Sequence, residues 1–322
     1  MACMTDTVRV RVPATSANLG PGFDALGLAL SLHDEVDAWV CESGLSIEIS
    51  GEGADLAGAG EEHLVVRAMR AAFAVTGGQP PGIGLRCVNR IPHGRGLGSS
   101  AAAVVAGILA ARALAPAGAD ALPDGAALLG LATEFEGHPD NVAACLAGGL
   151  TIAWTSGSGP QAARLAPLAG LAPVLCVPET PLATEQARGL LPPKVPHPDA
   201  AANSARAALL IAGLTVDPAL LMAGTEDFLH QPYRAPVMPA TAELISQLRA
   251  AGVPAVMSGA GPAVLALTVP GTHPGPEAVA LVADRTGTAW QVRVLDVDRE
   301  GAGVNPFIRR PRAQDEKGSV QA

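Results

Sequence analysis

The chain has 322 residues, of which 49% are hydrophobic and 3% aromatic, and this length suits one large domain or two of ordinary size. Its net charge of −9 argues against a general nucleic-acid-binding protein, because that role needs a basic surface that displaces counterions. Although the mean hydropathy is +0.31, the most apolar stretch, residues 101–111, is far shorter than the roughly 20 residues that cross a bilayer, and we expect no membrane segment.

The five cysteines are odd in number and scattered: Cys3, Cys41, Cys87, Cys145 and Cys176. They have neither disulfide-framework nor zinc-ligand spacing, and the N-terminus lacks the pattern of a secretory signal. These observations favour a cytoplasmic protein with reduced thiols.

In the first half, alternating apolar and polar residues predict strands over residues 8–12, 45–50 and 84–88, the first of which is expected to end at Pro13. Residues 63–75 have the spacing of an amphipathic helix. A glycine turn and a long helix are predicted over residues 96–113, and this helix is apolar almost all round, so we expect it to be buried. A helix ending near Glu136 and a strand over residues 150–154 follow.

Residues 155–170 are rich in Ser, Gly and Pro, which predicts a junction between two halves of the chain. The elements predicted after it are strands over residues 172–177, 255–258, 263–268 and 289–297 and helices over residues 200–214, 239–251 and 276–286. Because strands and helices mix without regular alternation, we predict an α+β fold in two domains, residues 1–165 and 166–308. The charged tail, residues 309–322, is expected to be disordered.

The most informative stretch is a glycine- and serine-rich loop that leads directly into the long helix. Its residues are Pro92, His93, Gly94, Arg95, Gly96, Leu97, Gly98, Ser99, Ser100, Ala101 and Ala102. Glycines let the backbone approach a ligand closely, and the N–H groups at the start of a helix bind anions, phosphates in particular. The loop lacks the Gly-Lys-Ser/Thr ending of a P-loop and the G-x-G-x-x-G spacing of a dinucleotide fold. The alternative interpretation is a turn that only starts a buried helix.

Three motifs in order resemble those of the GHMP kinases. Residues 92–101 are similar to the ATP loop of that family, residues 13–24 (PATSANLGPGFD) to its N-terminal motif, and residues 258–263 (SGAGPA) to its second glycine-rich loop. The resemblance implies ATP and Mg²⁺ as cofactors. It also implies an N-terminal α+β domain with a left-handed βαβ crossover, joined to a ferredoxin-like C-terminal domain.

Within this family, the N-terminal motif resembles that of the homoserine kinases rather than those of the galactokinases or mevalonate kinases. Residues 136–143 (EGHPDNVA) are also similar to the homoserine kinases, which have asparagine at the position of Asn141, where mevalonate kinases have an aspartate. The resemblance therefore implies L-homoserine as the small-molecule substrate, a role in threonine biosynthesis, and a homodimer.

The same resemblance assigns the amino-acid substrate to Asn18, Asp24, His138, Asn141, Thr184, Arg188, Arg234 and Gly261. Arg188 and Arg234 match positions that clamp the substrate carboxylate, and a planar guanidinium makes paired bonds to a carboxylate that lysine cannot make. Asn18 and Asp24 match residues that hold the ammonium and hydroxyl end. On the sequence alone each arginine is more simply a solvated surface charge, and His138 is a structural hydrogen-bonding residue or a neighbour of the substrate.

By resemblance, Ser100 and Glu136 would hold Mg²⁺, since a hydroxyl and a carboxylate suit a hard cation. Glu134 is the alternative ligand, because on a helix it points about 200° away from Glu136 and only one of the two can face the metal. Asn141 would position the acceptor hydroxyl. No carboxylate base is evident, so we expect the proton to pass to the γ-phosphate during transfer. Arg95 either contacts phosphate or is an exposed loop tip.

Three other functions stay open at this stage. A GHMP kinase for an isoprenoid alcohol would be expected to have an aspartate base in place of Asn141 and no arginine clamp. A catalytically silent ATP-binding sensor would not need Ser100, Glu136 and Arg188 together. A purely structural α+β protein would not need three ordered motifs.

Overall fold

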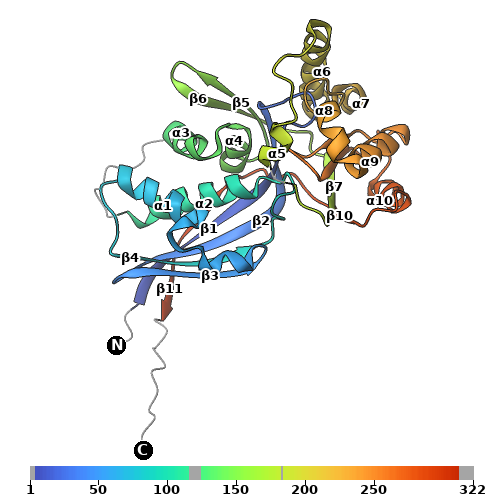
Figure 1. The fold of residues 1–322 in the computed structure, drawn as a ribbon. Helices are drawn as coiled ribbons and strands as arrows, with labels where there is room; N and C mark the ends of the chain where they lie inside the picture. The colour runs from blue at the N-terminus through green and yellow to red at the C-terminus, as the bar shows by residue number, and fades with distance from the viewer. Residues whose placement is uncertain (1–3, 116–124, 183, 312–322) are drawn as a thin grey trace, which may run out of the picture.

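The computed structural model describes residues 4–115, 125–182 and 184–311 (Figure 1). Its first part is a seven-stranded sheet with the strand order β11-β1-β2-β4-β3, in which β5 pairs with β2 and β6 pairs with β5. These strands are β1 (Met4–Ala17), β2 (Leu26–Cys41), β3 (Gly44–Gly51), β4 (Gly82–Asn89), β5 (Leu150–Ser156), β6 (Gly159–Leu165) and β11 (Gly303–Pro311).

Helices cover one face of this sheet (Figure 1). They are a 3₁₀ segment (Ala54–Glu62), α1 (Leu64–Val75), α2 (Ser99–Leu114), α3 (Gly125–Glu136) and α4 (Asp140–Ala147). Strands β3 and β4 run parallel and are joined through α1, which is the βαβ unit that the resemblance implies. Helices α1 and α2 touch at the backbone, because a Cβ added at Gly107 would lie only 2.5 Å from the carbonyl oxygen of Val65.

The second part is a four-stranded antiparallel sheet with helices packed against it. Its strands, in sheet order, are β10 (Trp290–Val294), β7 (Ala172–Pro178), β9 (Val264–Thr268) and β8 (Ala255–Met257). Its helices are α5 (Thr184–Arg188), α6 (His197–Thr215), α7 (Leu221–Gly224), α8 (Gln231–Arg234), α9 (Pro239–Ala250) and α10 (Pro276–Arg285), with 3₁₀ segments at Pro218–Leu220 and Ala235–Val237. Leu244 of α9 and Val279 of α10 share a core with this sheet. The predicted α+β, two-part GHMP kinase fold is confirmed.

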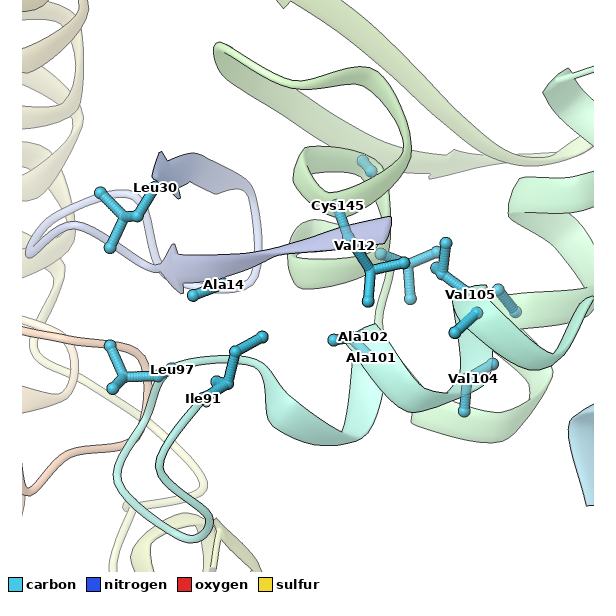
Figure 2. Close-up of a cluster of buried hydrophobic side chains, with 14 of the residues drawn as sticks. Val12, Ala14, Leu30, Ile91, Leu97, Ala101, Ala102, Val104, Val105 and Cys145 are labelled. Carbon is cyan, nitrogen blue, oxygen red and sulfur yellow. The ribbon is translucent and has the colours of Figure 1, made fainter. Parts of the chain in front are cut away.

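The core of the first part anchors the loop before α2. In β1 the apolar positions Val8, Val10 and Val12 are fully buried, as their alternation predicts. Helix α2 is buried over its central part, between Ala101 and Ala111, which confirms the expectation from its apolar composition. Figure 2 shows Ile91 and Leu97, on the segment that leads into α2, close to β1. The burial of Ile91 and Leu97 in this core therefore holds the segment that carries Gly94 and Gly96 in place.

Pro13 does not end the first strand, and that prediction is wrong. Strand β1 continues to Ala17, and its pairing with β2 shifts register between Pro13 and Ala14. Such an irregularity accommodates a residue that has no N–H to donate to the ladder. Strand β2, which pairs with β1 on one side and β4 on the other, was not among the predicted elements.

The predicted junction at residues 155–170 is largely a hairpin, so this prediction is also wrong. Strands β5 and β6 pair antiparallel around a turn in which Gly159 has a φ of +99° and the Ser156 hydroxyl donates to the Gly159 carbonyl. Small residues serve here as turn formers rather than as a linker. The two-domain division stays a prediction, although its boundary follows the end of β6 at Leu165.

The position of the last strand, β11, differs from two predictions, the domain division and the disordered tail. β11 pairs antiparallel with β1, so the segment from Gly303 belongs to the first sheet. Arg309 to Pro311, assigned to a disordered tail, are part of this strand because β1 offers them an unpaired edge. Residues 312–322 lie outside the described residues. Within the described ranges no helix is long and apolar enough to cross a membrane.

Candidate active site

Two cavities meet at the start of α2. A polar one of about 360 Å³ lies against the glycine loop. It is lined by Asn18, Asp24, Gly94, Gly96, Leu97, Gly98, Ser99, Ser100, Phe135, Glu136, His138, Asp140, Asn141, Glu185, Arg188, Arg234, Gly259 and Ala260. A second, more apolar one of about 350 Å³ includes Leu64 and Val65 of α1 and Ala102, Ala103 and Ala106 of α2. Ser99 and Ser100 line both cavities, so one ligand can extend along the loop from one to the other.

The glycine loop and the second glycine-rich segment are packed against each other. Gly96 has a φ of +73°, and a Cβ there would lie 2.0 Å from the carbonyl oxygen of Ser258. The Ser258 hydroxyl contacts both the Gly96 carbonyl, at 2.7 Å, and the Ser16 hydroxyl, at 2.8 Å. The first-turn N–H groups of α2, which have no partners within the helix, start at Ser99 on the cavity wall. This is an anion-binding geometry.

Thr15 connects the loop to Asn141. Its backbone N–H donates to the Leu97 carbonyl at 3.0 Å, and its hydroxyl donates to Oδ1 of Asn141 at 2.8 Å. With Oδ1 engaged, the Nδ2 amide group of Asn141 remains to donate into the cavity that it lines. A Cβ at Gly98 would lie 2.0 Å from the Thr15 hydroxyl oxygen and 2.9 Å from Asn141 Oδ1.

Gly98→Ala should therefore lower kcat strongly, while Gly94→Ala should not. Both glycines have a φ of +66°, so both alanines bear the same backbone strain, of roughly 1–2 kcal/mol. At Gly94 the nearest atom to a new Cβ is a side-chain carbon of Pro181 at 3.3 Å, whereas at Gly98 the new methyl group displaces the Thr15–Asn141 contact. Initial rates and melting temperatures of the two variants test this. Equal losses of kcat at equal stability would contradict it.

Ser100 and Glu136 lie together at the edge of the polar cavity. The Ser100 hydroxyl donates to Oε1 of Glu136 at 2.5 Å. Burial raises the pKa of Glu136, and the Ser100 hydrogen bond opposes that shift. Glu134 is exposed and does not line the cavity, which separates the two carboxylates as their helical spacing predicts. No cluster of three or more His, Cys, Asp or Glu side chains able to hold a metal occurs in the described part of the chain.

Asp140 organises the turn between α3 and α4. It is 1% exposed, and its Oδ1 accepts both the Asn141 backbone N–H, at 2.8 Å, and Nδ1 of His138, at 2.7 Å. The hydrogen bond that Asp140 accepts from the ring raises the pKa of His138. This hydrogen bond fixes His138 on the cavity wall through Nδ1, and Nε2 takes no part in it.

Asp24 and Arg188 form a two-pronged ion pair across the cavity. The guanidinium nitrogens donate to the two carboxylate oxygens at 2.8 and 3.0 Å, which raises the pKa of Arg188. Asn18 supports Asp24, because its Oδ1 accepts the Asp24 N–H at 2.9 Å while its Nδ2 donates to the Gly259 carbonyl at 2.8 Å. Asn18 therefore ties the N-terminal motif to the second glycine-rich segment as well as lining the cavity.

Arg234 is 1% exposed and, among the described residues, makes no ion pair. It donates to the carbonyls of Ala187 and Gly259 at 3.2 and 3.3 Å and contacts Nδ1 of His230 at 2.9 Å. Burial, and then the like charge of Arg188, lowers the pKa of Arg234 to about 10, so the side chain is still charged at neutral pH. A buried cation on a cavity wall without an anionic partner is a strong site for a ligand carboxylate.

Some residues in the predicted sets lie outside the polar cavity. Ala101 and Ala102 are buried in the core, and Pro92 is buried beneath the loop. His93 lines the more apolar cavity. Arg95 is half-buried rather than an exposed loop tip, because its guanidinium donates to the backbone carbonyls of Pro178, Glu179 and His93. Its contact with phosphate stays a prediction.

Gly261 and Thr184 complete the set of predicted substrate residues. Gly261 does not line the cavity; its place is taken by Gly259 and Ala260, and a Cβ at Gly261 would lie 2.6 Å from the sulfur of Met238. Thr184 is the first residue of α5, but its side chain lies outside the described part of the structure.

Sequence reasoning missed Thr15, Phe23, Asp140 and His230. Thr15 and Phe23 stand inside the N-terminal motif, and Asp140 inside the 136–143 motif, so the motifs themselves carried a signal. Phe23 lies near both arginines, with its ring centre 5.6 Å from the Arg188 guanidinium and 5.7 Å from that of Arg234. Nothing in the sequence marked His230 as a site residue except its position close to Arg234 in the chain.

Comparisons with known proteins place this arrangement in a family. The model of the GHMP kinases N-terminal domain matches residues 63–149, and that of the GHMP kinases C-terminal domain matches residues 208–286. The chain is 56% identical to the homoserine kinase of Streptomyces coelicolor over 93% of its length and 95% of that protein. It is 51% identical to the homoserine kinase of Clavibacter michiganensis over 92% of its length and 93% of that protein.

Solved structures agree with these matches. The crystal structure of homoserine kinase from Cytophaga hutchinsonii is similar with a TM-score of 0.80 and 29% identity, covering 95% of this chain and 99% of that one. A 4-(cytidine 5'-diphospho)-2C-methyl-D-erythritol kinase shares the fold, with a TM-score of 0.57 and 23% identity over 89% of this chain and 98% of that one. The predicted resemblance is confirmed: the chain belongs to the GHMP kinase family, in its homoserine kinase branch.

Proposed function

We propose that this protein transfers the γ-phosphoryl group of ATP to the side-chain hydroxyl of L-homoserine, giving O-phospho-L-homoserine for threonine biosynthesis. The observation that carries the proposal is the lining of one polar cavity. It combines an anion-binding helix start at Ser99 with a carboxylate, Asp24, and two guanidiniums, Arg188 and Arg234. A phosphate donor and a zwitterionic acceptor are the ligands that such a lining would bind side by side.

The Asp24–Arg188 pair supports an amino acid as acceptor. A zwitterion can insert into this pair, its ammonium group taking the place of Arg188 on Asp24 and its carboxylate the place of Asp24 on Arg188. Each protein charge then keeps an opposite charge as partner. A ligand with only one of the two charges would leave one protein group without a partner, which is costly in a half-buried site. Arg234 would complete the carboxylate clamp from the buried side.

The two cavities support ATP as donor. The triphosphate would lie along Gly96–Ser100, and the nucleoside would lie in the more apolar cavity beside α1 and α2. The donor set fits Mg²⁺, because the Ser100 hydroxyl and the Glu136 carboxylate are adjacent and phosphate and water oxygens would complete the shell. Bound there, Mg²⁺ would neutralise phosphate charge.

The transfer step needs little from the protein beyond alignment. Asn141, whose amide orientation is set by Thr15, would donate from Nδ2 to the acceptor hydroxyl oxygen. That oxygen forms a bond to the γ-phosphorus as the bond to the departing ADP oxygen breaks. In this arrangement Asp24 holds the ammonium group, Glu136 would hold Mg²⁺, and Asp140 accepts from His138. We therefore expect the hydroxyl proton to pass to the transferred phosphate.

A coupled assay of ADP release across homoserine, threonine, serine, mevalonate and galactose tests the proposal. We expect homoserine to have the highest kcat/KM, and we expect no ADP release when a chelator removes Mg²⁺. Faster turnover of mevalonate or another alcohol without amino-acid charges would make the substrate assignment wrong. Binding of ATP and homoserine without ADP release would identify a sensor instead. The homodimer and the cytoplasmic location stay predictions.

A further inference from the structure

A buried histidine behind the amino-acid site is in direct contact with Arg234. His230 is fully buried, directly before α8, and Arg234 is the last residue of that short helix. Asp227 fixes the start of the helix, because its carboxylate accepts the N–H groups of Leu229, His230 and Gln231 at 2.8, 3.1 and 2.6 Å. The backbone therefore presents His230 and Arg234 to each other in a defined orientation.

The partners of the His230 ring determine which nitrogen carries the proton. Nε2 lies 2.9 Å from the Gly20 carbonyl oxygen, which can only accept, so Nε2 must donate. Nδ1 lies 2.9 Å from Nη1 of Arg234, which can only donate, so Nδ1 must accept. Burial, opposed by Asp227 and reinforced by the charge of Arg234, lowers the pKa of His230 to about 4. The ring is therefore neutral at physiological pH, as this geometry requires.

Of the three acceptors that hold the Arg234 guanidinium, Nδ1 of His230 is the nearest, at 2.9 Å. Nε and Nη1 of Arg234 are held by backbone carbonyls and by His230, whereas Nη2 has no hydrogen-bond partner among the described residues. The ring of Phe23, on the loop that carries Asp24, lies 5.4 Å from that of His230. The His230 side chain thus contacts both Arg234 and the Gly20 carbonyl of the loop leading to Asp24.

We propose that His230 is a positioning residue for the substrate: its unprotonated Nδ1 orients Arg234 toward the carboxylate of the amino acid, and the Gly20 carbonyl selects the tautomer that makes this possible. The inference rests on the proposed function, because it assumes that Arg234 binds that carboxylate. Among the described residues, the side-chain hydrogen bonds of His230 go to Gly20 and Arg234 and not to the glycine loop, so its contribution concerns the amino acid and not ATP.

His230→Ala should raise KM for homoserine by roughly tenfold to a hundredfold, the range expected for losing a hydrogen bond to a charged group. KM for ATP should not change, and kcat should change much less than KM for homoserine. His230→Asn and His230→Gln are the matched pair. Asparagine keeps an acceptor near the position of Nδ1, and glutamine keeps a polar group near that of Nε2. Asparagine should therefore restore most of the homoserine affinity and glutamine little of it.

A double-mutant cycle with Arg234→Ala separates positioning from a purely structural effect. If His230 acts through Arg234, then His230→Ala should have no further effect on homoserine KM once Arg234 is alanine. Additive effects, equal behaviour of the asparagine and glutamine variants, or an unchanged KM in His230→Ala would overturn the proposal. If His230→Ala does not fold, the comparison of KM for homoserine between His230→Asn and His230→Gln still tests the proposal. A wild-type enzyme that does not phosphorylate homoserine would instead overturn the proposed function.

Discussion

Arg234→Ala should lower kcat/KM for homoserine by roughly thirtyfold to several thousandfold. The substitution leaves the substrate carboxylate without its buried partner, and losing one member of such a charge pair typically costs about 2–5 kcal/mol. Arg234 is 1% exposed, so its attraction for the carboxylate is little screened by water. Arg188→Ala should have a smaller effect, because the Arg188 side chain is 42% exposed and is already paired with Asp24. Lysine at position 234 should restore only part of the loss, since a point charge cannot reproduce the planar guanidinium.

The discriminating control is an acceptor without a carboxylate, 3-amino-1-propanol. The wild-type protein should use it poorly, and Arg234→Ala should reduce that residual rate hardly at all. ATP binding should also be unchanged, because Arg234 does not contact the glycine loop. Equal losses on homoserine and on 3-amino-1-propanol would show that Arg234 serves the phosphates or the fold instead. Melting temperatures of the variants separate these last two possibilities.

Ser100→Ala and Glu136→Ala should each lower kcat by roughly a hundredfold to a thousandfold, with a much smaller change in KM for homoserine. Both side chains would help to neutralise charge that matters most while the phosphoryl group moves. In the structure they are joined by a 2.5 Å hydrogen bond.

Glu134→Ala is the matched control, because it removes an identical side chain from the same helix but from an exposed position. It should retain nearly normal activity. An inactive Glu134→Ala beside a normal Glu136→Ala would move the metal assignment by two positions. Single-turnover rates at saturating ATP and homoserine measure the step directly.

The local elements could be predicted because their signals are local. The helix observed at Leu64–Val75 and the long buried helix that begins at Ser99 follow from apolar spacing and composition over consecutive residues. The failures occurred where the decisive partner is distant. Pro13 remains in a strand because β2 shifts register opposite it, and Arg309 to Pro311 form a strand because β1 offers an edge some 300 residues away in the chain. No local pattern contains that information.

The sequence by itself determined the class of ligand and the family. A glycine- and serine-rich loop leading into a helix is typical of a phosphate site, because the backbone N–H groups at the helix start bind anions, and the ordered motifs around it identified the family. Only the tertiary structure decided how each side chain is used. It joined Thr15 to Asn141 and Asp24 to Arg188, across 126 and 164 residues of chain, and it set His230 against Arg234. The physical reason is that a motif specifies which donors and acceptors are present, whereas partner, tautomer and charge state depend on which groups folding buries together.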